Sequence, residues 1–68
     1  MGALPIHTDS YGVYAYTVYR EEGDGLYFMM INGEAYLEGG EIFKGGFVQV
    51  CAKLEEVKIA NGPGGDEA

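Results

Sequence analysis

The sequence predicts a small α+β domain, in which a three-stranded antiparallel meander carries one C-terminal helix. Residues 11–20 and 26–31 are rich in aromatic and β-branched or other apolar side chains, which suit a pleated sheet. The dipeptide Asn32-Gly33 is favoured in two-residue hairpin turns. Residues 47–60 carry apolar side chains at three- and four-residue steps, which is typical of a helix with one buried face.

The elements follow in order along the chain. Pro5 and the polar run at 7–10 favour an irregular lead-in over residues 1–10. Three strands are then expected, at 11–20, 26–31 and 34–38. A turn at 21–25, which contains two Gly and an Asp, separates the first two strands. The third strand ends at Gly39-Gly40.

Residues 47–60 are open to two interpretations. A helix would place one apolar stripe on a single face, formed by Phe47, Val50, Cys51, Leu54 and Val57. Asn61-Gly62-Pro63 then ends it, because Gly is common just after a helix and Pro cannot continue one. A strand would alternate well only until Glu55-Glu56. The helix is preferred, and the alternative is a small all-β barrel with a strand at 47–59.

The length of 68 residues allows one domain, expected at 1–61, and residues 62–68 are expected to form a flexible acidic tail. A chain of this size buries only about 60% of its unfolded surface, so a partner chain would add to its stability. Both faces of the first two predicted strands carry large side chains, whereas a sheet with one face in water alternates more cleanly. The face rich in Tyr and Met is therefore a candidate for contact with a partner or a second copy.

The sequence contains no pattern that indicates catalysis. His7, Ser10 and Cys51 are the only residues of their types, and nothing in their spacing pairs a nucleophile with a base. A single cysteine excludes an internal disulfide and fits a cytoplasmic location. Ligand spacings typical of zinc are absent from the sequence, and no apolar run approaches the roughly 18 residues of a membrane span. We expect a cytoplasmic protein that is not an enzyme, has no cofactor or metal, and does not contact membranes.

Charge is the most informative property of the chain. Eleven acidic residues face four basic ones, which gives a formal charge of −7. Such an excess destabilises the compact state, so either a basic partner or a need for solubility accounts for it. Six acidic residues and no basic one lie between positions 21 and 41. Glu34 and Glu38 are expected on one face of the third strand, about 13 Å apart, with Tyr36 between them.

A short, strongly acidic, Tyr- and Gly-rich chain of this kind resembles the small phage-encoded anti-CRISPR proteins and other DNA mimics. The resemblance lies in size, acidity and segments such as 14–22 and 34–41. It implies an inhibitor whose carboxylates occupy the Lys and Arg surface that a nuclease complex reserves for DNA.

We therefore expect a non-enzymatic acidic protein that blocks a basic, DNA-binding surface of a partner, such as a CRISPR nuclease complex. Direct binding of nucleic acid is not expected, since phosphate binding needs Lys and Arg. The expected contacts are carboxylates and one aromatic anchor: Glu21, Glu22, Asp24, Glu34, Tyr36, Glu38 and Glu41, with Tyr27 as an additional anchor. The alternative function is a structural or assembly module that forms a homodimer through its Tyr/Met-rich sheet.

Overall fold

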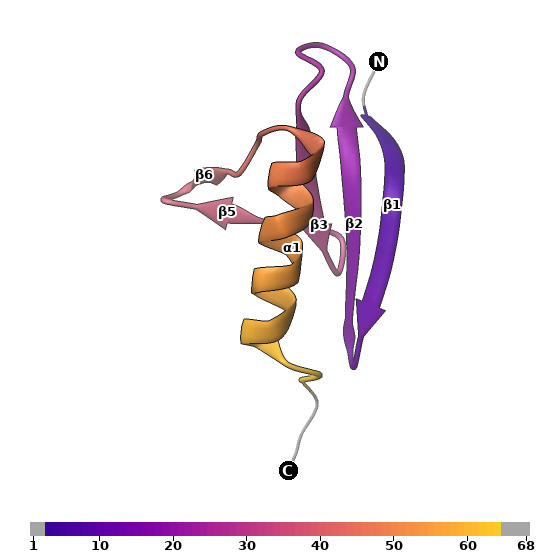
Figure 1. Cartoon of the computed structure of the whole chain (residues 1–68), viewed down its shortest axis with the longest axis vertical. Helices are drawn as coiled ribbons and strands as arrows, with labels where there is room; N and C mark the ends of the chain where they lie inside the picture. The colour runs from indigo at the N-terminus through magenta and orange to yellow at the C-terminus, as the bar shows by residue number, and fades with distance from the viewer. Residues whose placement is uncertain (1–2, 65–68) are drawn as a thin grey trace.

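The computed structural model describes residues 3–64 and places one helix across one face of an antiparallel sheet (Figure 1). Four strands form this sheet in the order β1-β2-β3-β4, with bounds Ala3–Tyr11, Tyr14–Glu21, Tyr27–Ile31 and Glu34–Ala35. A second, two-stranded sheet joins β5 (Leu37–Glu38) to β6 (Glu41–Ile42), and the helix α1 spans Phe47–Asn61. The predicted α+β class with one C-terminal helix is confirmed, and the all-β alternative is wrong because 47–59 lie in α1.

The first strand begins earlier than predicted. Residues 3–10 belong to β1, so the prediction of an irregular lead-in is wrong over this range. Pro5 is accommodated because β1 is an edge strand, where a missing N–H leaves no gap in the sheet. Pairing with β2 shifts between Pro5 and His7, which is a bulge at Ile6. The predicted strand at 11–20 is accordingly divided, with Tyr11 ending β1 and β2 starting at Tyr14.

The Asn32-Gly33 hairpin forms as predicted. Asn32 has a φ of 51° and Gly33 a φ of 85°, the positive pair that a type I′ turn requires. Ile31 and Glu34 face each other across β3 and β4 on either side of this two-residue loop. Asn32 also ties the turn to β2, since its side-chain Oδ1 accepts the N–H of Ala15 at 2.9 Å.

The third predicted strand, at 34–38, is interrupted at Tyr36. The N–H of Tyr36 still donates to the Met29 carbonyl at 2.9 Å, but the chain then leaves the sheet as the β5–β6 hairpin, which projects to one side in Figure 1. The chain returns to the same edge of β3, where Tyr27 and Gly45 exchange backbone hydrogen bonds of 2.8 and 3.0 Å. The prediction of three strands is therefore corrected to a four-stranded sheet with a second small sheet.

The helix begins and ends at glycines. The N–H of Gly46 donates to Oε1 of Gln49 at 3.4 Å, and the N–H of Gly62, at φ 65°, donates to the Lys58 carbonyl at 3.0 Å. Pro63 accepts a backbone hydrogen bond of 2.8 Å from Val13, so residues 62–64 lie against the β1–β2 turn. The remaining residues of the expected tail, 65–68, lie outside the described residues.

The core lies between the helix and the sheet. It consists of five fully buried side chains from β2, β3 and α1: Tyr16, Val18, Met29, Val50 and Leu54. The buried hydroxyl of Tyr16 accepts a hydrogen bond from Nδ2 of Asn61 at 3.3 Å, which satisfies its polar atom. No helix in the described part of the chain covers the opposite face of the sheet.

Candidate functional site

Six carboxylates of the described residues are organised around the three lysines of the chain. Each lysine contacts two acidic side chains, and in each case at least one of them comes from a distant part of the sequence. Two carboxylates and one ammonium leave a formal charge of −1 at every such cluster. These six carboxylates are therefore divided among three clusters rather than gathered on one flank.

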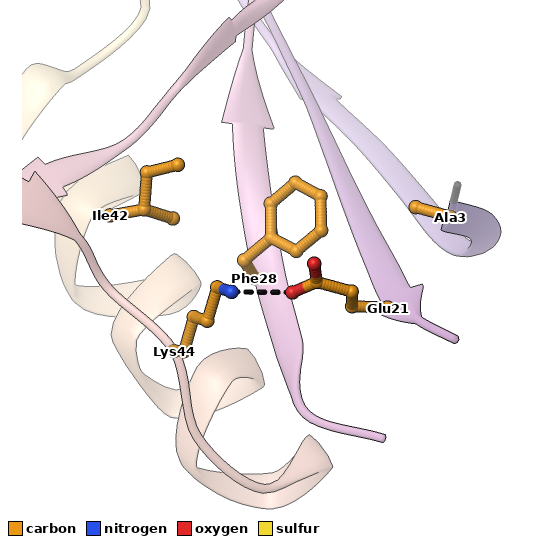
Figure 2. Close-up of a pocket in the computed structure, with 5 residues that line it drawn as sticks. All are labelled: Ala3, Glu21, Phe28, Ile42 and Lys44. Carbon is orange, nitrogen blue, oxygen red and sulfur yellow. Dashed lines mark hydrogen bonds and ion pairs between the residues drawn. The ribbon is translucent and has the colours of Figure 1, made fainter. Parts of the chain in front are cut away.

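Lys44 holds the first cluster at the end of the β2–β3 hairpin. Its Nζ contacts the carboxylate of Glu21 at hydrogen-bonding distance (Figure 2) and lies 3.6 Å from Oδ2 of Asp24. The hydrogen bond to Glu21 raises the pKa of Lys44. Asp24 is oriented mainly by the backbone, because the Leu26 N–H donates to its Oδ1 at 3.0 Å and lowers its pKa.

Lys53 holds the second cluster between the β5–β6 hairpin and α1. Its Nζ lies 2.8 Å from Oε1 of Glu56 and 3.5 Å from Oε2 of Glu38. The same ammonium lies 5.4 Å from the centre of the Phe43 ring, within cation–π distance. The hydrogen bond between Lys53 and Glu56 raises the pKa of the lysine and lowers that of the carboxyl.

A hollow of about 350 Å³ opens beside this second cluster. We call it the hairpin–helix notch, and its walls come from both elements: Glu38, Phe43, Gln49, Ala52, Lys53 and Glu56. Glu41 lies next to it, because it is the cross-strand partner of Glu38 in the β5–β6 pair. The Glu56 side chain is 71% exposed and that of Glu38 is 50% exposed, so both carboxylates remain open to a partner.

Lys58 holds the third cluster between the end of α1 and β1. Its Nζ lies 2.6 Å from Oδ2 of Asp9 and 3.2 Å from Oε2 of Glu55. The hydrogen bond from Lys58 lowers the pKa of Asp9, and the same contact is the main cause that raises the pKa of Lys58. This cluster attaches the helix to the edge strand and lies apart from all the residues predicted as contacts.

The predicted contact residues are thus only partly brought together. Glu21 and Asp24 share Lys44, and Glu38 and Glu41 are paired across the second sheet. Glu34 lies on β4, in a different sheet from Glu38, so the expected common strand face does not form. Glu22 is exposed in the turn after β2.

The predicted aromatic anchors contribute to packing within the molecule. Tyr36 is half-buried and meets Phe43 edge to face, with ring centres 6.2 Å apart. Tyr27 is also half-buried and meets Phe47 edge to face at 5.3 Å. Both rings are therefore largely committed to intramolecular contacts.

Other reactive groups form no cluster. Cys51 is half-buried, and burial raises the pKa of its thiol, with the nearby Glu55 carboxylate adding to the effect. Within residues 3–64, no three His, Cys, Asp or Glu side chains are arranged to hold a metal ion. Over the same residues, no helix has both the length and the apolar character to cross a membrane.

The predicted contact residues did not include Glu56 or the lysines. The pairs Lys53–Glu56 and Lys58–Glu55 are three residues apart on a helix, a spacing that favours contact. On a helix over residues 47–60, this spacing is sufficient to indicate both ion pairs. The contacts of Lys44 with the hairpin carried no such local signal, because they join residues at least twenty positions apart in sequence.

Comparison of the chain with models of protein families, with curated proteins and with solved structures finds no match in any of the three.

Proposed function

We propose that the protein is a non-catalytic binding protein that docks on a basic surface of another protein. Its carboxylates would take the place of nucleic-acid phosphates on a surface that binds DNA, as in a CRISPR nuclease complex. The proposal rests on one observation: all three lysines are held by the protein's own carboxylates, two to each lysine, so the excess of acid remains at the surface.

The hairpin–helix notch is the contact region that the geometry favours. Glu38 and Glu56 contact a single ammonium, that of Lys53, and Glu41 lies across the β5–β6 pair from Glu38, so the three carboxylates leave an excess of two negative charges in this region. The carboxylates are exposed and come from separate elements, so they present acid over an area rather than along one strand. Arg side chains of a partner could then make charge-assisted bonds with several of them.

The test begins with the intact protein used as bait in a cell lysate, in buffers of about 50 and 300 mM salt. Ion pairs between exposed groups weaken with ionic strength, so we expect a basic, DNA-binding protein to be retained only at low salt. The recovered partner is then mixed with a fluorescent DNA duplex. Added protein should displace the duplex and lower its fluorescence anisotropy.

The variant Glu38→Gln/Glu41→Gln tests the location of the contact. Charge-assisted hydrogen bonds contribute about 1.5–3 kcal/mol each, so the double variant should lose at least about tenfold in affinity. Glu55→Gln is the matched control, because it removes charge from the Lys58 cluster and should bind almost normally. Affinity that does not change with salt, or a partner that holds the protein and DNA together, would contradict the proposal.

A further inference from the structure

The face of the sheet that α1 leaves uncovered differs from the rest of the surface in its charge and in the sizes of its side chains. Cross-strand pairing identifies its residues, since directly paired side chains share a face. Tyr16 and Val18 point to the core, so the alternate positions of β2 and their partners form the opposite side. We call this side the open face, and its members are Ala3, Pro5, Thr8, Ser10, Ala15, Thr17, Tyr19, Glu21, Phe28, Met30 and Ala35.

Charge is nearly absent from the open face. Glu21 is its only acidic residue, and the ammonium of Lys44 pairs with it at the rim. The other strand carboxylates of the four-stranded sheet, Asp9 and Glu34, are paired with Tyr16 and Ile31 and so lie on the helix side. Two copies could therefore meet through their open faces without opposing their negative charges.

The centre of the open face is aromatic and apolar. Tyr19 and Phe28 stack with ring centres 5.5 Å apart and planes 14° apart, and Met30 lies further along β3. Figure 2 shows Phe28 between Ile42 and Glu21. These side chains line a hollow of about 260 Å³. These half-buried side chains form a ridge over β3 and the adjoining part of β2.

Small side chains cover the other half of the open face, so this half projects less than the ridge. Thr8 and Ser10 on β1, with Ala15 and Thr17 on β2, form a floor of small side chains beside the ridge. A two-fold axis parallel to β2 would place β3 of one copy over β1 of the other. The ridge of each copy would then meet the floor of its partner, which is the self-complementarity that an isologous dimer requires.

The size of the face fits a weak dimer. The four strands have 9, 8, 5 and 2 residues, and at about 3.3 Å per residue and about 4.8 Å between strands they give roughly 380 Å² for each face. Two such faces correspond to roughly 760 Å² of buried area, which is the size of a weak, concentration-dependent interface rather than a permanent one. Face-to-face sheets pack about 10 Å apart, which side chains of this size can fill.

We propose that a second copy of the chain covers the open face, in a two-fold dimer with the helices on the outside. This inference goes beyond the proposed function and uses none of the residues that line the hairpin–helix notch. Ala15 is the position best suited to a test, because it is exposed and lies in the floor. The backbone N–H and carbonyl of Ala15 form hydrogen bonds with Asn32, and the Ala15 side chain takes no part in them.

The experiment is sedimentation equilibrium on the full chain and on two variants with the same chemical change. Ala15→Glu places a carboxylate in the interface, where it would be buried without a partner, so we expect the dimer to be lost. Ala60→Glu adds the same charge at an exposed position of α1 and should leave the dimer unchanged. Circular dichroism melts of each variant confirm that the fold is retained.

A mixed sample, with one copy isotope-labelled and the other not, provides a second measurement. Nuclear Overhauser contacts from the Met30 methyl group of one copy to Thr8 or Ala15 of the other are expected. A wild-type chain that remains monomeric at millimolar concentration would overturn the proposal. A dimer that survives Ala15→Glu would also overturn it. So would a dimer that Ala60→Glu dissociates as strongly as Ala15→Glu does, because added charge alone would then govern association.

Discussion

The helix packs on the sheet through very few side chains, so Leu54→Ala is expected to be severe. Leu54 is 1% exposed and belongs to the five-residue core. Replacing a buried leucine by alanine costs about 2–5 kcal/mol, depending on how far the surroundings collapse into the cavity. Half-buried neighbours such as Tyr14 and Val57 pack on this core and can relax inward. We therefore expect a loss of about 2–3 kcal/mol, toward the lower end of that range.

This loss is large for a domain of this length. At roughly 0.05–0.15 kcal/mol per residue, the free energy of unfolding of the whole chain is about 3–10 kcal/mol. A domain of 60–100 residues shifts its melting temperature by about 4–8 °C per kcal/mol, so Leu54→Ala should lower Tm by about 10–20 °C. The measurement is thermal and urea denaturation followed by circular dichroism.

The control is Ile59→Ala on the same helix. Ile59 is 75% exposed, so its removal should change the free energy of unfolding by no more than about 0.5 kcal/mol. The reasoning would be refuted if Leu54→Ala cost less than about 1 kcal/mol. It would also be refuted if Ile59→Ala were equally destabilising, because the helix would then bury a different face.

Two further predictions concern the turn that meets residues 62–64 and the response to acid. Gly12→Ala should destabilise the fold by about 1–3 kcal/mol, since Gly12 has a φ of 65° and an added Cβ would lie 1.8 Å from the Pro63 oxygen. Gly23→Ala, which meets nothing within 4 Å, is the matched control in the same denaturation assay. The pKa of Asp9 lies below its ordinary value of 3.8 because Lys58 donates a hydrogen bond to it. A carboxyl group whose pKa is lowered by folding contributes its full stabilisation at pH values above its ordinary pKa. This stabilisation is lost as the pH falls through the lower pKa of the folded state. When Tm is measured from pH 7 to pH 2, it should therefore decrease at pH values under about 4, and Asp9→Asn should make this decrease smaller. If Asp9→Asn left the dependence of Tm on pH unchanged, the role given to the Asp9–Lys58 pair would be contradicted.

Sequence patterns were sufficient where the determining signal was local. Asn32-Gly33 specified a type I′ hairpin because few residues adopt a positive φ at low cost, and the structure has both residues in that region. The apolar spacing and Gly62-Pro63 indicated the helix over 47–60, and α1 occupies Phe47–Asn61. Only part of the predicted apolar stripe is fully buried, namely Val50 and Leu54, whereas Phe47 is exposed and Cys51 and Val57 are half-buried.

The failures came from contacts between distant segments. Residues 3–10 look irregular on their own, and they become a strand because β2 offers them a full edge of hydrogen-bonding partners. Tyr36 interrupts a run that alternates well, because Gly45 returns to pair with Tyr27 at the start of β3 and the hairpin between them lies outside the four-stranded sheet. The position of Lys44 beside Glu21 and Asp24 follows from that return, and no local pattern could have indicated it.

The separation of charge from the open face has a consequence for any complex. The notch is lined by Glu38, Phe43 and residues of α1, and a dimer formed through the open faces would leave α1 on the outside. A dimer would then present two notches related by the two-fold axis, and each could bind a basic partner independently. Binding two sites on one extended partner would raise the overall affinity through effective concentration, whereas two separate partners would give a two-to-two complex. We therefore compare the stoichiometry of the isolated complex between wild type and Ala15→Glu. This comparison distinguishes binding by one notch of a monomer from binding by the two notches of a dimer. A monomeric variant that keeps its affinity for each site but loses this avidity would show that the two surfaces act separately.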